Sequence, residues 1–296
     1  MLGETLALLA AVNWAVSIVL FRKSERFSAQ GINLFKNVLA SALLLLTLLV
    51  LGSGFDTTRS AEDWSRLIFS GVIGISIADT LIFTALRKLG ASLYSVMNCG
   101  YAPIIVALSV VFLGEPVGLP FLVGGVLVVT GVLVVASDNS DPSAGSPTSR
   151  ADFVTGFVWG TLGLLGMGFG VILVKPVLAS GGLVEITAVR MLAGVAGQLV
   201  WILFVPSQRE ALSVFKPDPA WRSLVPGAFL GSYVAMLLWL GGFKWALASV
   251  ASVLNQLASV FTIVLARIFL GEALTPRRMF GAGLAIAGAI WIVVSR

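Results

Sequence analysis

The chain has no histidine and only one cysteine among its 296 residues. Histidine is the usual side chain for proton relays and metal coordination near neutral pH, and a Ser-His-Asp triad cannot form without it. The single cysteine, Cys99, can form neither a disulfide within the chain nor a cysteine-based zinc site. A Walker motif is missing as well. We therefore expect no catalytic residue, no metal and no cofactor.

Charged residues are also scarce, at 11% of the chain, whereas 58% of the residues are hydrophobic. Soluble domains carry about 25% charged residues. The net charge is +5, and the basic residues are scattered singly or in pairs between apolar runs. This distribution is typical of residues that set membrane topology and not of a nucleic-acid-binding surface. The composition predicts a multi-pass protein of the cell (inner or plasma) membrane, with the lipid bilayer as partner and no nucleic acid.

Apolar runs separated by charged, glycine or proline breaks predict ten transmembrane helices, because one span needs about 20 mostly apolar residues. The first run has no basic residue before it, so we expect a retained helix and not a signal peptide. The fold class is thus an all-α membrane protein. The expected helices lie near 4–21, 32–51, 66–86, 92–113, 118–136, 153–174, 183–205, 222–243, 249–270 and 276–294.

One connection differs from the other short ones. Residues 137–152 read SDNSDPSAGSPTSRAD, a composition too polar for lipid and too poor in large apolar residues for a core. This linker falls near the midpoint of the chain. We expect two five-helix units, 1–136 and 153–296, on either side of it.

The two units are copies of one another. Trp64 and Trp221 each open a predicted span, and their separation of 157 residues aligns further features without a gap. A unit with an odd number of helices must enter the membrane from the opposite side in its second copy. Inverted repeats of this kind recur in secondary transporters, with the substrate site near the midplane between the halves. The features aligned by the 157-residue offset are Asn98 with Asn255, FLGE at 112–115 with FLGE at 269–272, and Gly124 and Gly131 with Gly281 and Gly288.

The paired stretches ASLYSVMNCGYAPIIVALSVVFLGEP and ASVASVLNQLASVFTIVLARIFLGEALTP are each followed by a glycine-patterned helix. With these stretches the chain resembles the EamA-like, ten-helix branch of the drug/metabolite transporter superfamily over nearly its whole length. The resemblance implies export or uptake of small organic solutes by alternating access, without ATP hydrolysis. The halves also differ, since Pro103 is aligned with Val260 and Asp79 is aligned with Met236.

Asp79 is the sharpest candidate for a functional residue. It lies in the middle of an apolar segment, and an aspartate at the bilayer centre costs about 2.5–3.5 kcal/mol on insertion scales. It should therefore face a cavity or a partner. One interpretation is a counter-charge for a substrate amine or a protonation site for coupling. The other is a buried aspartate paired with Lys36 or a nearby hydroxyl.

Asn98 and Tyr101 share a helix face, and Asn255 and Gln256 occupy the matching place in the second half. These residues are candidates for two symmetric polar walls of a central substrate site. Amides also hydrogen-bond across transmembrane helices as interhelical links, so both interpretations stand. Pro103 has no N–H to donate, which should leave a backbone acceptor free next to Asn98.

Lys36 and Arg190 are lone basic residues early in the second helix of each unit. Together they could bind an anionic group, but both lie near a helix end, and snorkelling to the interface is the favoured interpretation. Trp14 and Tyr233, with Trp239, have two interpretations: an aromatic wall of a cavity, or ordinary packing within the bundle.

Glu115 and Glu272 repeat in the two halves, yet a structural role is favoured for both. Each follows Leu-Gly at the end of a predicted helix, shortly before the next helix begins. A carboxylate there can accept hydrogen bonds from the free N–H groups of a helix start. The glycines of 153–174 and of the last helix in each unit should allow close helix packing.

The orientation of the chain has two competing predictions. Lys and Arg gather in the connections after the first, third, fifth, seventh and ninth helices, so the positive-inside rule places both termini outside. The family resemblance implies cytoplasmic termini.

The leading hypothesis is a secondary transporter, exporter or importer, for small organic metabolites such as amino acids or amine-bearing compounds. It would work by alternating access at a midplane site, with protons as the candidate coupling ion. The alternative is an uncoupled facilitator or exchanger of small anionic metabolites. A membrane-embedded enzyme is the least favoured hypothesis, because the chain has no catalytic cluster.

Overall fold

The structure is a computed structural model that describes residues 1–22, 27–137, 149–270 and 275–295. Throughout these residues the chain forms helices and short connections, without strands. The first half contains α1 (Leu2–Arg22), α2 (Ala29–Val50), α3 (Ala61–Gly71), η1 (Val72–Ile77), α4 (Ala78–Asn98), α5 (Tyr101–Leu113) and α6 (Leu119–Ala136). The second half contains α7 (Arg150–Ser180), α8 (Leu183–Phe204), η2 (Pro206–Phe215), α9 (Trp221–Ala228), η3 (Phe229–Val234), α10 (Ala235–Trp245), α11 (Ala248–Asn255), α12 (Leu257–Leu270) and α13 (Pro276–Val294).

Within the described residues, seven helical segments are long and apolar enough to cross a membrane, and three more apolar segments are shorter. The expected break between 86 and 92 is absent, because α4 continues to Asn98 and the chain instead breaks before α5. In the second half the corresponding turn lies at 246–247, as expected, and a further break at Gln256 separates α11 from α12. The expected linker falls largely on 138–148, outside the described residues, and Ser149 caps the start of α7.

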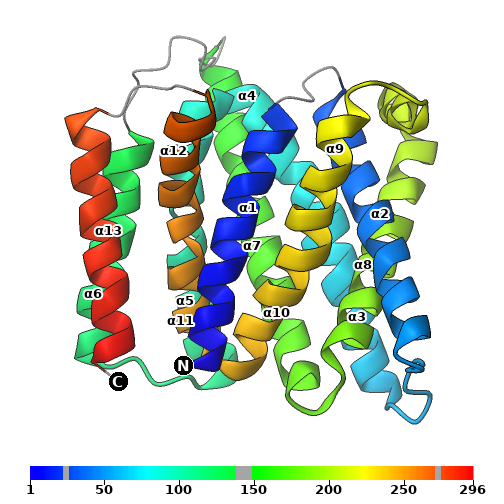
Figure 1. Cartoon of the computed structure of the whole chain (residues 1–296), viewed down its shortest axis with the longest axis horizontal. Coiled ribbons are helices and arrows are strands. Elements are labelled where there is room, and N and C mark those ends of the chain that lie inside the picture. Colours follow the sequence, from blue (N-terminus) through cyan, green and yellow to red (C-terminus); the bar gives the residue numbers. More distant parts are fainter. Residues whose placement is uncertain (23–26, 138–148, 271–274, 296) are drawn as a thin grey trace.

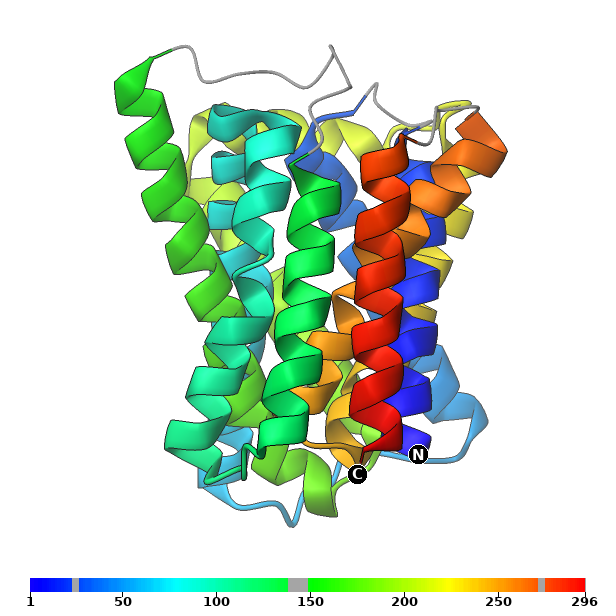
Figure 2. The same cartoon turned by 90° about the vertical axis from the view of Figure 1, so that its left-hand side faces the viewer.

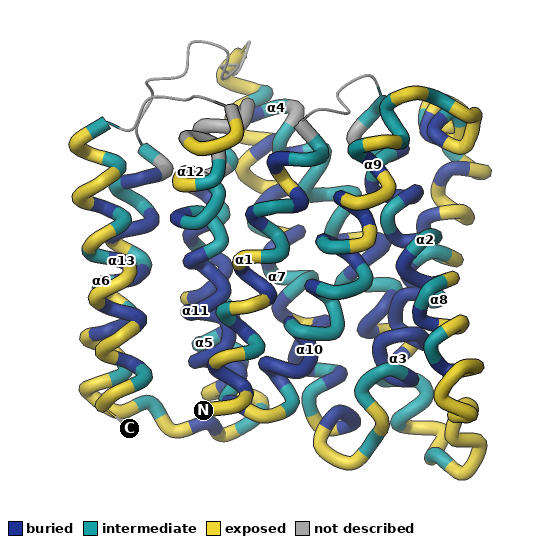
Figure 3. Tube along the Cα trace, viewed as in Figure 1, coloured by how far each residue is buried: buried dark blue, intermediate teal, exposed yellow. Residues whose placement is uncertain are grey.

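The helices stand side by side, and both chain termini lie at the same end of the bundle (Figures 1 and 2). Buried residues gather where helices face each other, and exposed residues lie on the outer faces and at the ends (Figure 3). The outer faces include large apolar side chains such as Phe112, Phe204 and Val294. Such an exposed apolar exterior suits contact with lipid chains.

Local backbone geometry repeats between the halves at the offset seen in the sequence. Two π-helical segments, η1 and η3, begin at Val72 and Phe229 and each spans six residues. Their separation is the same 157 residues that align Trp64 with Trp221. π-helical turns are rare and are often found at functional sites, because they free backbone groups and redirect side chains. Both segments contribute a carbonyl to the polar contacts described below.

Close contact between α6 and α13 depends on glycines from both halves, as the sequence predicted. A Cβ placed on Gly131 would lie 2.5 Å from the carbonyl oxygen of Gly281 and from the amide nitrogen of Ala285. One on Gly288 would lie 2.7 Å from the carbonyl oxygen of Gly124. The backbones therefore touch without intervening side chains, which is how small residues let transmembrane helices associate.

We expect Gly131→Ala to destabilise the protein by about 1–3 kcal/mol, because an overpacked interface must shift to admit the methyl group. Gly125→Ala is a matched control on the same helix, since a Cβ there meets nothing within 4 Å. Denaturant titrations of the purified variants in mixed micelles measure the difference. Equal stability of the two variants would contradict the close α6–α13 contact.

Candidate functional site

Arg190 lies on α8 and is buried between the two halves of the bundle, with 2% of its surface exposed. Its Nε donates to the Ser70 hydroxyl at 2.7 Å, and that hydroxyl in turn donates to the Gly170 carbonyl. The guanidinium lies over the Trp239 ring, with 5.6 Å from Cζ to the ring centroid. The expected snorkelling of Arg190 is therefore wrong: a neighbouring hydroxyl and ring hold the side chain inside the bundle.

The guanidinium of Arg190 has no carboxylate partner among the described residues, and its NH1 nitrogen is buried without a hydrogen bond. A buried charge is costly unless paired or hydrogen-bonded. Cation–π contact and a single hydroxyl compensate only part of that cost. Arg190 is thus an incompletely satisfied cation in the interior of the described bundle.

Two further buried polar atoms face this guanidinium. Tyr101, at the start of α5, lies in electrostatic contact with Arg190 and beside the Trp239 indole. The Tyr101 hydroxyl and the Trp239 indole nitrogen lie beside each other, and neither is bonded to any other residue within the described part of the chain. Trp14 packs against Trp239 with ring centroids 6.0 Å apart, while its indole N–H donates to the Gly231 carbonyl of η3 at 3.0 Å. Together Arg190, Tyr101, Trp239 and Trp14 form a cluster that we call the arginine site.

Lys36 and Asp79 form a second cluster. The Lys36 ammonium on α2 lies 3.9 Å from an Asp79 carboxylate oxygen at the start of α4, directly after η1. Both side chains keep about a fifth of their surface accessible, 22% and 19%. The Asn33 side chain also hydrogen-bonds the carboxylate. This distance is longer than a direct hydrogen bond, so the two groups form an ion pair without a direct hydrogen bond.

The Lys36–Asp79 pair continues into a buried chain of amides that the sequence reasoning did not identify. Asn37 donates to Asn33 at 3.3 Å and to Gln198 of α8 at 3.2 Å. Gln198 donates to the Ile75 carbonyl in η1 at 3.4 Å. The helical spacing of Asn33 and Asn37 beside Lys36 was the available signal. Lys36 and Arg190 therefore have different partners in the structure, and a joint anion site formed by the two stays a prediction.

The amide pairs predicted as symmetric walls have different roles. Gln256 donates to the carbonyls of Asn98 and Cys99, at 3.2 Å each. It thereby occupies the acceptor that Pro103 leaves free, as an interhelical link. Asn255 is buried with neither its oxygen nor its nitrogen bonded to any described residue. Asn98 is half-buried, and its side chain lies 3.5 Å from the Tyr94 hydroxyl, which can donate to it.

Tyr233 lies apart from the arginine site. Its hydroxyl is 2.6 Å from the Thr47 hydroxyl of α2. Both residues line an open groove of about 350 Å³ between α2 and η3, whose other lining residues are apolar. The structure therefore places Tyr233 in an interhelical contact beside an apolar groove, and not in the proposed central wall.

Glu115 caps a helix of the opposite half. Its carboxylate accepts from the backbone amides of Ala248 and Ser249, at 2.6 and 2.9 Å, and from the Ser249 hydroxyl at 2.8 Å. These amides start α11, whereas the sequence predicted a contact with the next helix in the chain. Lys175 donates to the carbonyls of Phe243 and Ala246 at the end of α10. We call the turn held by Glu115 and Lys175 the α10–α11 corner; Glu272 lies outside the described residues.

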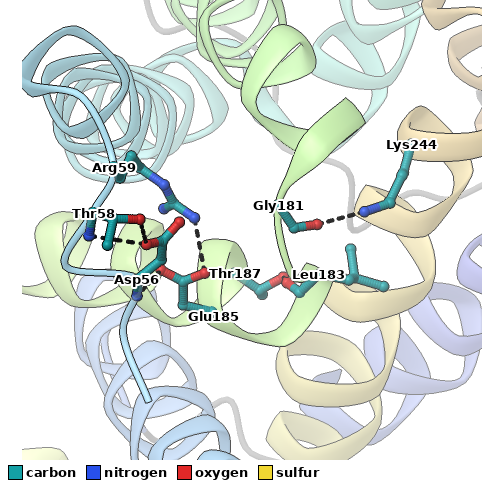
Figure 4. Close-up of polar contacts among 8 residues, drawn as sticks. All are labelled: Asp56, Thr58, Arg59, Gly181, Leu183, Glu185, Thr187 and Lys244. Carbon is teal, nitrogen blue, oxygen red and sulfur yellow. Dashed lines mark hydrogen bonds and ion pairs between the residues drawn. The ribbon is translucent and has the colours of Figure 1, made fainter. Parts of the chain in front are cut away.

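A buried ion pair joins the two halves at the same end of the bundle (Figure 4). Arg59, in the α2–α3 connection, lies 2.8 Å from Glu185 of α8, and both side chains are less than a tenth exposed. Glu185 also accepts from the Asp56 amide at 3.0 Å. Hydrogen bonds from Thr58 lower the pKa of the Asp56 carboxyl below its usual value. Lys244 at the end of α10 donates to the Gly181 carbonyl and ties the α7–α8 turn to α10.

The comparisons with known proteins agree with this architecture. The sequence profile of the EamA-like transporter family matches residues 1–137 and 154–294. No curated protein matches the chain. One solved crystal structure of a protein is similar over 99% of this chain and 96% of its own, with a TM-score of 0.81 and 17% identity, which concerns the fold alone. Because the family profile matches nearly the whole chain in two successive units, the protein belongs to the EamA-like transporter family.

Proposed function

We propose that the protein is a secondary transporter of small organic metabolites in the cell membrane, working by alternating access between two inverted five-helix halves. Membership of the EamA-like family supports a membrane transporter of small molecules. The matching π-helices at one offset support a duplicated unit, and an odd number of spans per unit would invert the second copy.

The observation that carries this proposal is the arginine site. Arg190 and Trp239 come from the second half, and Ser70 and Tyr101 from the first. Buried polar atoms without partners are rare in folded proteins, and a bound solute is one group that can satisfy them. A site built from both halves is also where relative movement of the halves would change access.

The polar contacts at the end that holds the chain termini suggest which side is closed. Arg59–Glu185 and the Glu115 cap both join the first half to the second there. Opening that end requires these buried contacts to break and similar ones to form at the other end.

Proton coupling is the second part of the proposal. Asp79 is the only acidic residue within the segment from η1 to α5, and its partner Lys36 is held at 3.9 Å. Because Lys36 already neutralises Asp79, a substrate amine would have to displace a lysine to bind there. A proton must also overcome the attraction of Lys36, but it binds the carboxylate without needing the space that an amine would take beside the lysine. We therefore assign Asp79 to coupling instead of amine recognition.

The proposal is tested first in cells, by comparing metabolite pools between cells that overproduce the chain and cells that lack it. At least one pool should change in opposite directions in the two strains. That metabolite is then offered to purified protein in proteoliposomes, with and without an imposed pH gradient. Saturable uptake that the gradient drives supports the proposal, whereas unchanged pools and no saturable flux would overturn it.

A further inference from the structure

The chemical class of the solute follows from the unpaired charge of the arginine site, provided that the proposed transport function holds. Arg190 brings one positive charge into the interior, whereas the ion pairs Lys36–Asp79 and Arg59–Glu185 are each neutral overall. Within the described chain no carboxylate pairs with Arg190, since each described ion pair uses other residues. The arginine site therefore carries one positive charge that no described carboxylate balances.

The free donors of the site match the geometry of a carboxylate. A guanidinium presents five N–H groups in a planar fork, and here Nε is used by Ser70 while NH1 is unpaired. The Tyr101 hydroxyl and the Trp239 indole N–H lie beside each other and are bonded to no other described residue, so they can also donate to a ligand. Arginine binds carboxylates through two parallel hydrogen bonds, and the charge makes each of them stronger than a neutral one. A planar anion with two acceptor oxygens would satisfy these donors at once.

We infer that the arginine site binds the carboxylate of a small monocarboxylic acid, with the Trp14 and Trp239 rings against its organic part. One cation balances one carboxylate, whereas a phosphate dianion would leave a net negative charge in a low-dielectric interior. A zwitterionic amino acid would bring an ammonium group as well. The described carboxylates inside the bundle are already engaged, because Asp79 pairs with Lys36, Glu185 pairs with Arg59 and Glu115 caps α11.

The test compares solutes of the same shape that differ in charge. Purified full-length protein in detergent is titrated with benzoate and benzamide, and with acetate and acetamide. Each dissociation constant is taken from the concentration dependence of the unfolding temperature. We expect benzoate to bind more tightly than benzamide by about 10- to 100-fold, the ratio typical of a hydrogen bond to a charged group. Inorganic phosphate and phenylalanine are titrated in parallel and should bind more weakly than benzoate.

Two variants test whether the preference for benzoate over benzamide depends on the arginine site. Arg190→Gln should bring the benzoate-to-benzamide ratio close to one, because the charge is lost while hydrogen-bonding capacity remains. Tyr101→Phe removes only a hydroxyl and should lower the ratio without removing the preference, which keeps the test available if Arg190→Gln does not fold. The control is Arg66→Gln, since Arg66 pairs with Glu62 on the surface of α3, and its ratio should equal that of the unmodified protein.

Several results would overturn the carboxylate assignment. These are equal binding of the carboxylates and their amides, binding of none of the four, tighter binding of phosphate or phenylalanine, or an unchanged ratio in both variants. The transport proposal fails separately. Charge-selective binding without flux in proteoliposomes would contradict transport but support the site, and flux of a solute that is indifferent to Arg190→Gln would support transport but refute the site.

Discussion

Asp79→Asn should abolish uptake driven by a pH gradient while leaving exchange of substrate across the membrane active. The asparagine keeps the shape of the carboxylate but cannot take up a proton. If Asp79 carries the coupling proton, gradient-driven accumulation should fall by at least about tenfold, equivalent to about 1.4 kcal/mol of lost driving free energy. Proteoliposomes measure both quantities, with labelled substrate on one side for accumulation and on both sides for exchange.

A second variant separates coupling from structure. Asp79→Asn leaves Lys36 without its ion-pair partner, 3.9 Å away in the unmodified protein, and this alone could impair the protein. The double variant with Lys36→Gln removes both charges. If the pair is merely structural, the double variant should recover gradient-driven uptake. Recovery would therefore refute the coupling role, whereas loss of accumulation in both variants with exchange retained would support it.

Glu115→Ala should have the largest effect on stability. The carboxylate accepts three hydrogen bonds from Ala248 and Ser249 at the start of α11, and all of these groups are buried. Its removal leaves two backbone amides without acceptors and places the Lys175 ammonium near an uncapped corner. Helix-cap losses and unsatisfied buried donors together predict a decrease of about 2–4 kcal/mol in the free energy of unfolding.

Denaturant titration of the detergent-solubilised protein, followed by tryptophan fluorescence, measures this decrease. Glu210→Ala is the control, because Glu210 lies exposed in η2 and should change the stability little. Glu115→Gln should lie between the two, since its amide oxygen can accept but carries no charge. If Glu115→Ala and Glu210→Ala unfold at the same denaturant concentration, the Glu115 carboxylate does not stabilise the α10–α11 corner.

The arginine site and the coupling pair lie on either side of one structural feature. Ser70, the hydroxyl partner of Arg190, lies just before η1, and Asp79 lies just after it. Gln198 on α8 bonds to the Ile75 carbonyl within η1, and Arg190 lies on the same helix. The two clusters therefore share η1 and α8 as common structural elements.

Composition, apolar spacing and the internal repeat were enough to predict an α-helical membrane protein of two related units. These features are local in the sequence: a span needs a run of apolar residues, and a duplication preserves its register over many positions. The glycine contacts of α6 and α13 were predictable for the same reason. The helix break near 87–91 was wrongly placed because a glycine in a helical pattern need not end the helix.

The partners of the buried polar groups could not be predicted from the sequence in this way. The sequence marked Asp79, Arg190 and Glu115, but it left open which partners they would meet. Lys36 with Asp79 was one of two alternatives, Arg190 was expected at the interface, and Glu115 was assigned to the wrong helix start. Ser70, Gln198 and Lys175 gave no recognisable signal, because a lone polar residue in an apolar segment is equally compatible with many neighbours.

The amino-acid sequence by itself determined that this chain lies in a membrane as two related helical units, since apolar runs and a repeated register are properties of the chain alone. The tertiary structure decided where the uncompensated charge lies. In a low-dielectric interior, the state of a charged side chain depends on the few groups within hydrogen-bond reach. For Arg190 and Asp79 those groups come from residues distant in the sequence, and only the packing of the two halves brings them together.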